Sequence, residues 1–329
     1  MKERADIPAD DKNIKKKFYL HDRIFWILLV TVLWYMIIFS MPLDLILFDS
    51  SAPLFFIFGV KTSSVTDPFV FVIVFYLSTL PAFIGAFVYT RLTKRNRFIF
   101  DSFLPRHGGN TIGKLLLGFL AGFVMNFSCI AAALIHGDFS LYLDFAASQI
   151  PFFLFAFLCV FIQSSAEELW CRGFVYERVN VRYPLWVSIL VNGLFFAALH
   201  IMNPGSGFLP ILDIFICGIS FSLAKWYTRS IWFPMGIHTA WNFTQNFLFG
   251  LPNSGLASAA SVFHQNVPAG SASNLIYDQT FGVEGAVPAI IADAVLGAVC
   301  LILAAKQGRL GELKMSRTKS EQTEKMVLK

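Results

Sequence analysis

The chain has 329 residues, of which 56% are hydrophobic and only 14% are charged, and 37 of them are Phe. This composition lies outside the range of soluble globular domains and indicates a polytopic membrane protein. The formal net charge of +5 does not indicate a nucleic-acid partner, because the basic residues gather in tails and short connections, as they do in cytoplasmic loops.

Eight apolar segments follow a basic N-terminal tail, and each is close to the roughly 20 residues that span a hydrocarbon core. The predicted spans are 24–41, 69–89, 115–135, 150–178, 185–200, 208–224, 231–249 and 287–305. The first has no small-residue cleavage site after it, so we interpret it as a retained helix and not as a signal peptide. A shorter apolar patch at 53–60 predicts an interfacial or re-entrant segment.

The distribution of Lys and Arg gives the expected orientation. With a cytoplasmic N-terminus, all of the 26 Lys and Arg residues except Lys61 fall in the tails or in connections on the cytoplasmic side. The long connection at 251–285, on the outer side, has no Lys or Arg. This positive-inside asymmetry predicts an all-α membrane helix bundle of about eight transmembrane helices in the cell membrane, with both termini cytoplasmic.

Ionisable groups at membrane depth are costly and are usually functional or paired, so the polar residues within the spans are the next signal. The stretch SSAEELWCRGFVYERV, residues 164–179, brings Glu167, Glu168 and Arg172 directly after an apolar run. The later spans contain Asn192, His200, Asp213, His238, Asn242 and Asp293. For Asn192, Asp213 and Asp293 we expect hydrogen bonds between helices.

Helix geometry indicates which of these groups can meet. At a rise of 1.5 Å per residue, the middle of a core about 30 Å thick is reached by Glu167, His200, His238 and Asn242. His238 and Asn242 are four residues apart and share one helix face, and Glu168 and Arg172 have the same spacing and can pair. Glu167 is turned about 100° from Glu168 and can therefore face a different partner.

This arrangement predicts a hydrolytic mechanism. A desolvated carboxylate can accept a proton from water, and a nearby His can orient that water, so Glu167 with His200 would form the base. His238 and Asn242 can donate hydrogen bonds to the oxygen that becomes negative when water attacks a carbonyl. The expected reaction is peptide-bond hydrolysis within the membrane.

Three sequence motifs carry a family resemblance. EELWCR at 167–172 fits EExxxR, FAALH at 196–200 fits FxxxH, and HTAWN at 238–242 fits HxxxN. In this order, on successive polar-bearing helices, the motifs resemble the CAAX prenyl endopeptidase and bacteriocin-processing (CPBP, or Abi) family of intramembrane proteases. The resemblance covers roughly 149–250. It implies a glutamate-dependent peptidase with Glu167 and His200 as the base, His238 and Asn242 at the oxyanion, and Glu168 and Arg172 as chiefly structural.

The resemblance suggests a division of the chain into five parts. We expect a basic cytoplasmic tail at 1–23, N-terminal transmembrane helices at 24–148 and the CPBP-like catalytic core at 149–250. An external loop with the last helix follows at 251–305, and a basic cytoplasmic tail at 306–329. The substrate would be a peptide or a membrane-associated protein in the lipid bilayer.

Other functions stay open on the sequence alone. One is a non-catalytic membrane scaffold or a bacteriocin self-immunity protein of the same family. A proton-relaying transporter is disfavoured because no internal repeat relates the two halves. The five Cys residues show no CxxC pair and are interpreted as packing residues. Two His, a Glu and an Asn could hold zinc, but an Asn amide is a poor ligand and no HExxH is present, so we expect no cofactor.

Overall fold

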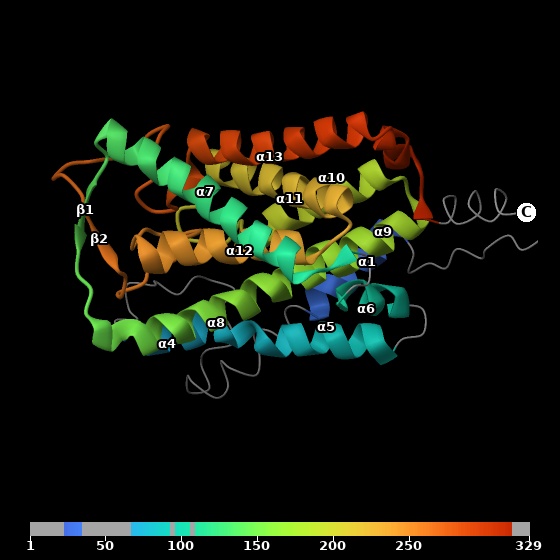
Figure 1. The fold of residues 1–329 in the computed structure, drawn as a ribbon, viewed down its shortest axis with the longest axis horizontal. Helices are drawn as coiled ribbons and strands as arrows, with labels where there is room; N and C mark the ends of the chain where they lie inside the picture. Colours follow the sequence, from blue (N-terminus) through green and yellow to red (C-terminus); the bar gives the residue numbers. More distant parts are fainter. Residues whose placement is uncertain (1–22, 35–66, 93–95, 106–108, 318–329) are drawn as a thin grey trace, which may run out of the picture.

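The computed structural model describes residues 23–34, 67–92, 96–105 and 109–317, which form a bundle of helices with one small sheet (Figure 1). Five helices in these ranges are long and apolar enough to cross a membrane: Pro68–Leu92, Ile112–His136, Ala147–Arg182, Phe208–Thr228 and Val287–Lys306. Leu185–Leu199 is also apolar but shorter. The predicted polytopic helical fold is confirmed, whereas the total of eight spans stays a prediction.

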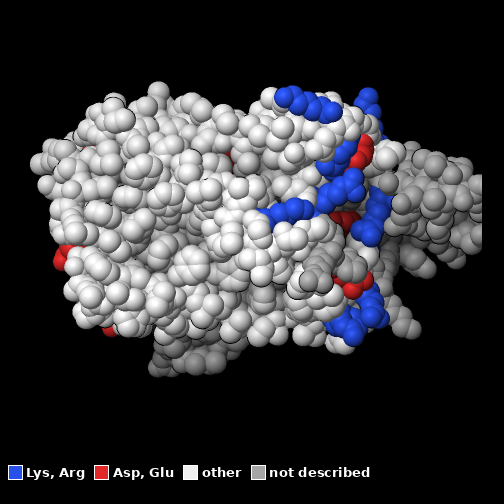
Figure 2. Space-filling view, viewed as in Figure 1, with Lys and Arg blue, Asp and Glu red and all other residues white. Residues whose placement is uncertain are grey.

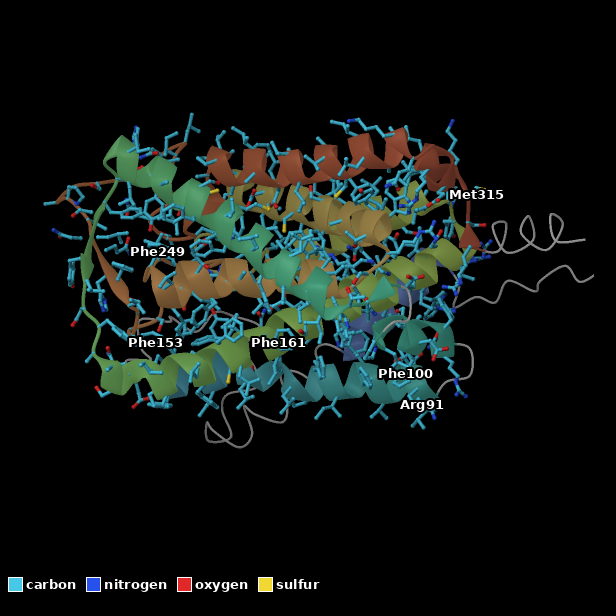
Figure 3. All side chains as sticks on the ribbon, in the orientation of Figure 1. Arg91, Phe100, Phe153, Phe161, Phe249 and Met315 are labelled. Atoms are coloured by element: carbon cyan, nitrogen blue, oxygen red, sulfur yellow. The ribbon has the colours of Figure 1, made fainter. Side chains whose placement is uncertain are left out.

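The N-terminal helices pack along one side of the bundle (Figure 1). Part of the first predicted span is helical, and the remainder of it, with the apolar patch at 53–60, lies outside the described residues. The elements of this part are α1 (Ile24–Trp34), α4 (Pro68–Phe75), η5 (Leu77–Thr79), α5 (Leu80–Leu92) and α6 (Arg97–Phe103). Arg91 at the end of α5 lies over the Phe100 ring of α6, 5.6 Å from its centroid (Figure 3).

The remaining helices cover the other predicted spans, with boundaries that differ by only a few residues. They are α7 (Ile112–His136), α8 (Ile150–Glu168), α9 (Tyr176–Arg182), α10 (Leu185–Leu199), α11 (Phe208–Thr228), α12 (Trp232–Phe243) and α13 (Val287–Lys306). Two π-helical segments, Leu169–Val175 and Thr244–Leu248, continue α8 and α12 respectively. The fourth predicted span is thus part of one long helix, Ala147–Arg182.

Helices α7 and α12 approach each other closely through glycines. A Cβ atom at Gly122 would collide with the Ile237 carbonyl oxygen, and one at Gly118 with the Phe233 carbonyl oxygen. From the other side, a Cβ at Gly236 would collide with the backbone of α7. Gly118 and Gly122 have the small-xxx-small spacing that lets two membrane helices make backbone contact. The position of α12 is therefore fixed by α7.

This contact determines the direction in which the polar face of α12, with His238 and Asn242, points. At 100° per residue, His238 and Asn242 lie roughly opposite the side that carries Gly236 and Ile237. Because the side with Gly236 and Ile237 packs against α7, the side with His238 and Asn242 faces α8 and α10. The glycines of α7 thus determine the direction in which the polar side chains of α12 point.

A two-stranded sheet joins the connection between α7 and α8 to the long connection at 251–285, which was predicted to lie on the outer side. Strand β1 (Ser140–Leu143), between α7 and α8, pairs antiparallel with β2 (Phe263–Asn266), and Ser140 lies opposite Asn266. The sheet lies at one end of the bundle (Figure 1). Figure 2 shows Lys and Arg side chains gathered at the opposite end of the same view. This distribution supports the predicted orientation, with the sheet outside.

Candidate active site

The two glutamates lie at the end of α8, where the helix changes from α to π geometry. Such π segments occur frequently at functional sites. Glu167 is 8% exposed and Glu168 is fully buried. Arg172 lies within the π segment and is fully buried as well. The site therefore brings charged groups into the protein interior, away from lipid.

Glu168 binds two partners with one oxygen. Its Oε1 accepts a hydrogen bond from Arg172 Nη1 at 2.9 Å and lies 3.0 Å from His238 Nδ1. The structure thus forms the Glu168–Arg172 pair that the spacing predicts. The contact of Glu168 with His238 was not predicted from the sequence. The carboxylate holds the guanidinium on its own helix and the imidazole on α12.

Arg172 is also held by groups other than Glu168. Its guanidinium lies over the ring of Phe196, 4.3 Å from the centroid. With its amide oxygen turned toward Arg172, Asn192 accepts from Nε at 3.2 Å and donates from its amide nitrogen to the Cys171 carbonyl at 2.8 Å. Asn192 also contacts Ser222 Oγ of α11 at 2.8 Å, which is the helix-to-helix bonding expected of it.

The other two polar residues from the late spans are also buried. Asp213 of α11 and Asp293 of α13 are 1% and 2% exposed. Within the described part of the chain, the Oδ1 atom of each has no hydrogen-bond partner.

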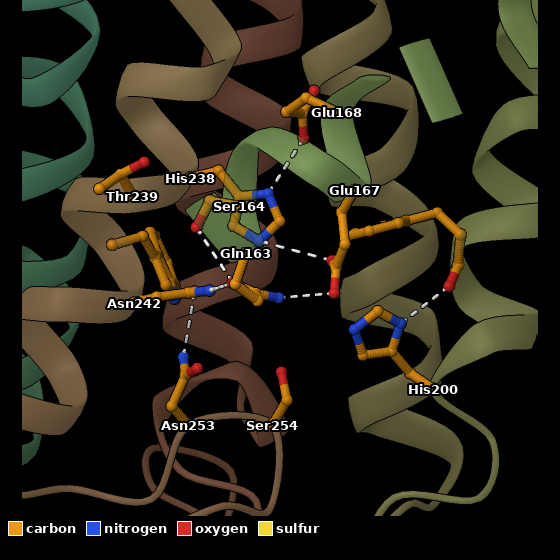
Figure 4. Close-up of polar contacts among 12 residues, drawn as sticks. Gln163, Ser164, Glu167, Glu168, His200, His238, Thr239, Asn242, Asn253 and Ser254 are labelled. Carbon is orange, nitrogen blue, oxygen red and sulfur yellow. Dashed lines mark hydrogen bonds and ion pairs between the residues drawn. The ribbon is translucent and has the colours of Figure 1, made fainter. Parts of the chain in front are cut away.

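Glu167 faces a different set of groups. Its Oε1 accepts a hydrogen bond from Gln163 Nε2 at 2.6 Å, and its Oε2 lies 3.8 Å from His238 Nε2 (Figure 4). The Gln163 Oε1 atom in turn accepts from Asn242 Nδ2 at 3.2 Å. Gln163 therefore links the carboxylate of α8 to the amide of α12. Gln163 was not predicted from the sequence. The spacing could have indicated it, because Gln163 is a polar residue one helical turn before Glu167 and lies on the same helix face.

His200 lies at the end of α10, with its ring beside Glu167 (Figure 4). Its Nδ1 is 2.9 Å from the Phe196 carbonyl oxygen. A carbonyl can only accept, so Nδ1 carries the hydrogen, and Nε2 of the neutral ring is left as an acceptor facing the site. Among the described residues, no direct hydrogen bond joins His200 to Glu167, so their predicted cooperation requires a molecule between them.

Phe196 does more than fill space. Besides lying under Arg172, its ring packs edge-to-face on His200 and His238, with centroids 4.8 and 6.0 Å apart. Both imidazoles are therefore held by one aromatic ring.

In the parts of the chain that the structure describes, no three His, Cys, Asp or Glu side chains form a group that could hold a metal ion.

The comparisons with known proteins fall on this same region. Residues 148–244 match the family model described as type II CAAX prenyl endopeptidase Rce1-like. Over 95 residues the chain is 35% identical to the Bacillus subtilis (strain 168) protein described as uncharacterized protein YyaK, and the match covers 28% of this chain and 31% of the relative. The resemblance to a CAAX prenyl endopeptidase family that the three motifs predict is therefore confirmed for residues 148–244, the segment that contains all three motifs.

Proposed function

We propose that this protein is an intramembrane endopeptidase in which Glu167 activates the water that attacks a peptide bond. The observation that supports this most directly is the convergence of Glu167, His238 and Asn242 on one buried site, with Gln163 between the carboxylate and the amide. The family match of residues 148–244 supports the reaction class.

Glu167 is suited to act as the general base. It is buried, and no hydrogen-bond donor within the described residues reaches its Oε2, while Gln163 fixes its Oε1. In the proposed reaction, Oε2 takes a proton from water as the water oxygen bonds to the carbonyl carbon. The same proton then passes to the leaving nitrogen as the C–N bond breaks. His200 Nε2, as an acceptor, orients the attacking water through the water's second hydrogen.

His238 and Asn242 are the proposed oxyanion donors. An ionised Glu168 can only accept, so Nδ1 of His238 carries the hydrogen that points to it. In the imidazolium form of the ring, Nε2 also carries a hydrogen and can donate to the oxyanion. Asn242 has two amide hydrogens, and only one of them is directed to Gln163. Glu168 then serves His238 as well as Arg172.

The proposal is tested with purified protein in liposomes and a library of quenched peptides, with each peptide made with and without a prenylated cysteine. We expect the wild type to cleave members of the library and Glu167→Gln to lose cleavage. Glu312→Gln is the matched control, because it makes the same chemical change in a cytoplasmic segment far along the chain, and it should cleave normally. Cleavage by Glu167→Gln at the wild-type rate, or no cleavage by the wild type, contradicts the proposal.

We further propose that the reaction needs no metal. A metal chelator should leave the cleavage rate of the purified wild type unchanged, because the base, the water-orienting group and the oxyanion donors are all side chains. The measurement is cleavage rate together with the zinc content of the protein. Stoichiometric zinc that is lost together with activity on chelation, and restores activity when added back, would assign a metal to the site.

A further inference from the structure

A short external loop, residues 251–256, lies against the site and outside the segment that matches the protease family. Side-chain amides fix its backbone: Asn246 Nδ2 donates to the Leu256 carbonyl at 2.8 Å, and Asn203 Nδ2 donates to the Ser254 carbonyl at 2.9 Å. Gln245 Nε2 donates to the carbonyl of Pro252 at 2.5 Å. These hydrogen bonds hold the loop in a defined position beside the site.

Glu284, just before α13, is the centre of a second set of bonds to this loop. The carboxylate is 5% exposed and accepts four hydrogen bonds. Its Oε2 accepts from the backbone nitrogen and the hydroxyl of Ser254 at 2.6 and 2.8 Å. Its Oε1 accepts from Trp241 Nε1 at 2.8 Å and from Asn253 Nδ2 at 2.9 Å. Burial raises the pKa of the Glu284 carboxyl, and the hydrogen bonds from Ser254 and Trp241 oppose that rise.

Asn253 connects this carboxylate to the proposed oxyanion site. Besides bonding Glu284, Asn253 Nδ2 donates to Asn242 Oδ1 at 3.3 Å (Figure 4). Asn242 donates onward to Gln163, and Gln163 donates to Glu167. Three side-chain amides therefore stand in series between two carboxylates: Asn253 donates to Glu284 at one end, and from Asn253 onward each amide donates to the next group as far as Glu167.

The direction of this series has a chemical reason. A side-chain amide has an acceptor end and a donor end of almost the same shape, so its neighbours decide which end faces where. An ionised carboxylate can only accept hydrogen bonds, so a side-chain amide next to it must direct its NH2 group toward the carboxylate. With the NH2 of Asn253 directed to both Glu284 and Asn242, the oxygen of Asn242 must face the loop. Its NH2 group must then face Gln163 and the site.

We infer that Glu284, acting through Asn253, is a positioning residue that keeps the NH2 group of Asn242 directed into the active site. This inference rests on the proposed function for the role of Asn242. In this role Glu284 and Asn253 act through Asn242, and none of their hydrogen bonds among the described residues is with Glu167 or His200. They act by excluding the reversed amide, which would present an oxygen to the oxyanion and repel it.

The test compares Asn253→Ala with Asn203→Ala, which removes one tether of the same loop by the same chemical change but does not contact Asn242. We expect Asn253→Ala to lower kcat at least about 10-fold, toward the 10²- to 10³-fold typical of losing an oxyanion-hole donor, with KM little changed. Asn203→Ala should stay within about twofold of wild type. Glu284→Gln, which preserves side-chain size, should lower kcat in the same direction.

A double-variant measurement separates positioning from general loosening. In an Asn242→Ala background, Asn253→Ala should cause no further loss of kcat, because the group it positions is absent. Equal losses in Asn253→Ala and Asn203→Ala, or a full further loss in the Asn242→Ala background, would overturn the inference.

A melting experiment tests the link itself without any turnover. The Tm shifts of Asn242→Ala and Asn253→Ala should be non-additive in the double variant, whereas those of Asn242→Ala and Asn203→Ala should add. Additive shifts for the first pair would overturn the inference. If the wild type cleaves no peptide but the first pair is coupled, the proposed function fails while the link between the two amides stands.

Discussion

Glu167 and Glu168 are neighbours in the chain, but their surroundings give them different chemistry. Glu168 is fully buried between a guanidinium and an imidazole. Glu167 has a carboxylate oxygen directed toward the site, without a hydrogen-bond donor among the described residues. The difference arises from the turn of about 100° between successive helical residues. Substitution of each glutamate by Gln should therefore have different results.

Glu167→Gln keeps the size and hydrogen-bonding capacity of the side chain but cannot take a proton from water. We expect turnover to fall by a factor of about 10² to 10⁴, the usual contribution of a general base. Folding should be retained, since Gln163 can still donate to an amide oxygen at this position. The measurements are kcat on a cleaved peptide and Tm of the same preparation.

Glu168→Gln should act mainly through stability. It leaves the buried Arg172 without its counter-charge, a loss of about 3 to 5 kcal/mol for a deeply buried pair, and it weakens the support of His238. We expect a lower Tm, partly recovered when Arg172→Met removes the uncompensated charge. Equal Tm losses in both Gln variants, with turnover surviving in Glu167→Gln, would assign the base to Glu168.

At the residue scale, the sequence could predict contacts within one helix but not those between helices. The spacing of Glu168 and Arg172 is enough to predict their pair, since residues four apart share a face. The bond of Glu168 to His238 depends on how α12 is rotated against α8, which no local pattern contains. Asn253 was not predicted at all, because its role depends on a loop path between distant elements.

At the element scale, the glycines of α7 determine where the proposed oxyanion donors lie. Gly122→Leu would place a side chain where the Ile237 carbonyl oxygen now sits and would push α12 away. We expect a destabilisation of at least about 1 to 3 kcal/mol, as in other overpacked interiors, together with reduced turnover. The measurements are Tm and kcat.

Gly113→Leu is the matched control for that experiment. It makes the same substitution in α7, but the nearest atom to a Cβ at this position is Thr111 Oγ1 at 3.9 Å. Gly113→Leu should therefore melt close to the wild type. If both variants melt at the same temperature, the contact between α7 and α12 does not hold the helices as described.

The attachment of the short helix η12 (Arg309–Lys314), which is predicted to be cytoplasmic, can be tested by changing the pH. Glu312 Oε2 accepts from Trp226 Nε1 of α11 at 2.8 Å, and Glu312 Oε1 from Arg309 Nε at 3.1 Å. Burial alone would raise the pKa of Glu312, but the hydrogen bonds from Arg309 and Trp226 outweigh it and lower the pKa below its ordinary value of 4.5.

The sign of the pH effect follows from that shift. Because the folded-state pKa is lowered, the stabilisation is fully present above pH 4.5 and is lost as the pH falls through the folded-state value. The Tm difference between wild type and Glu312→Gln should therefore be constant at neutral pH and shrink below pH 4.5. A difference that grows as the pH falls would have the wrong sign.

Helices marked by long apolar runs in the sequence were predicted well. The strands, which form only by pairing with each other, were not. The boundaries of α7 and α13 differ from the predicted spans by three residues or fewer, because long apolar runs mark them. The sheet of β1 and β2 was missed because its strands have only four residues each and lie far apart in the chain. The π geometry after Glu168 has no recognised sequence signature.

At the scale of the whole molecule, the orientation in the membrane is the remaining prediction. A reporter fused after Lys329 should be found in the cytoplasm, and one inserted near Ser258, in the connection that carries β2, should be found outside. The reason is the gathering of Lys and Arg at the end opposite the sheet. Finding both reporters on one side would remove the eight-span topology.

The length of the helix Ala147–Arg182 makes the thickness of the lipid bilayer relevant to the chemistry. Its 36 residues extend about 54 Å, against a hydrocarbon core of about 30 Å. The helix must therefore cross at a tilt or project beyond the core, and lipids with longer or shorter acyl chains change that balance. Because Glu167 lies on this helix, the depth of the proposed catalytic carboxylate depends on the host membrane as well as on the protein.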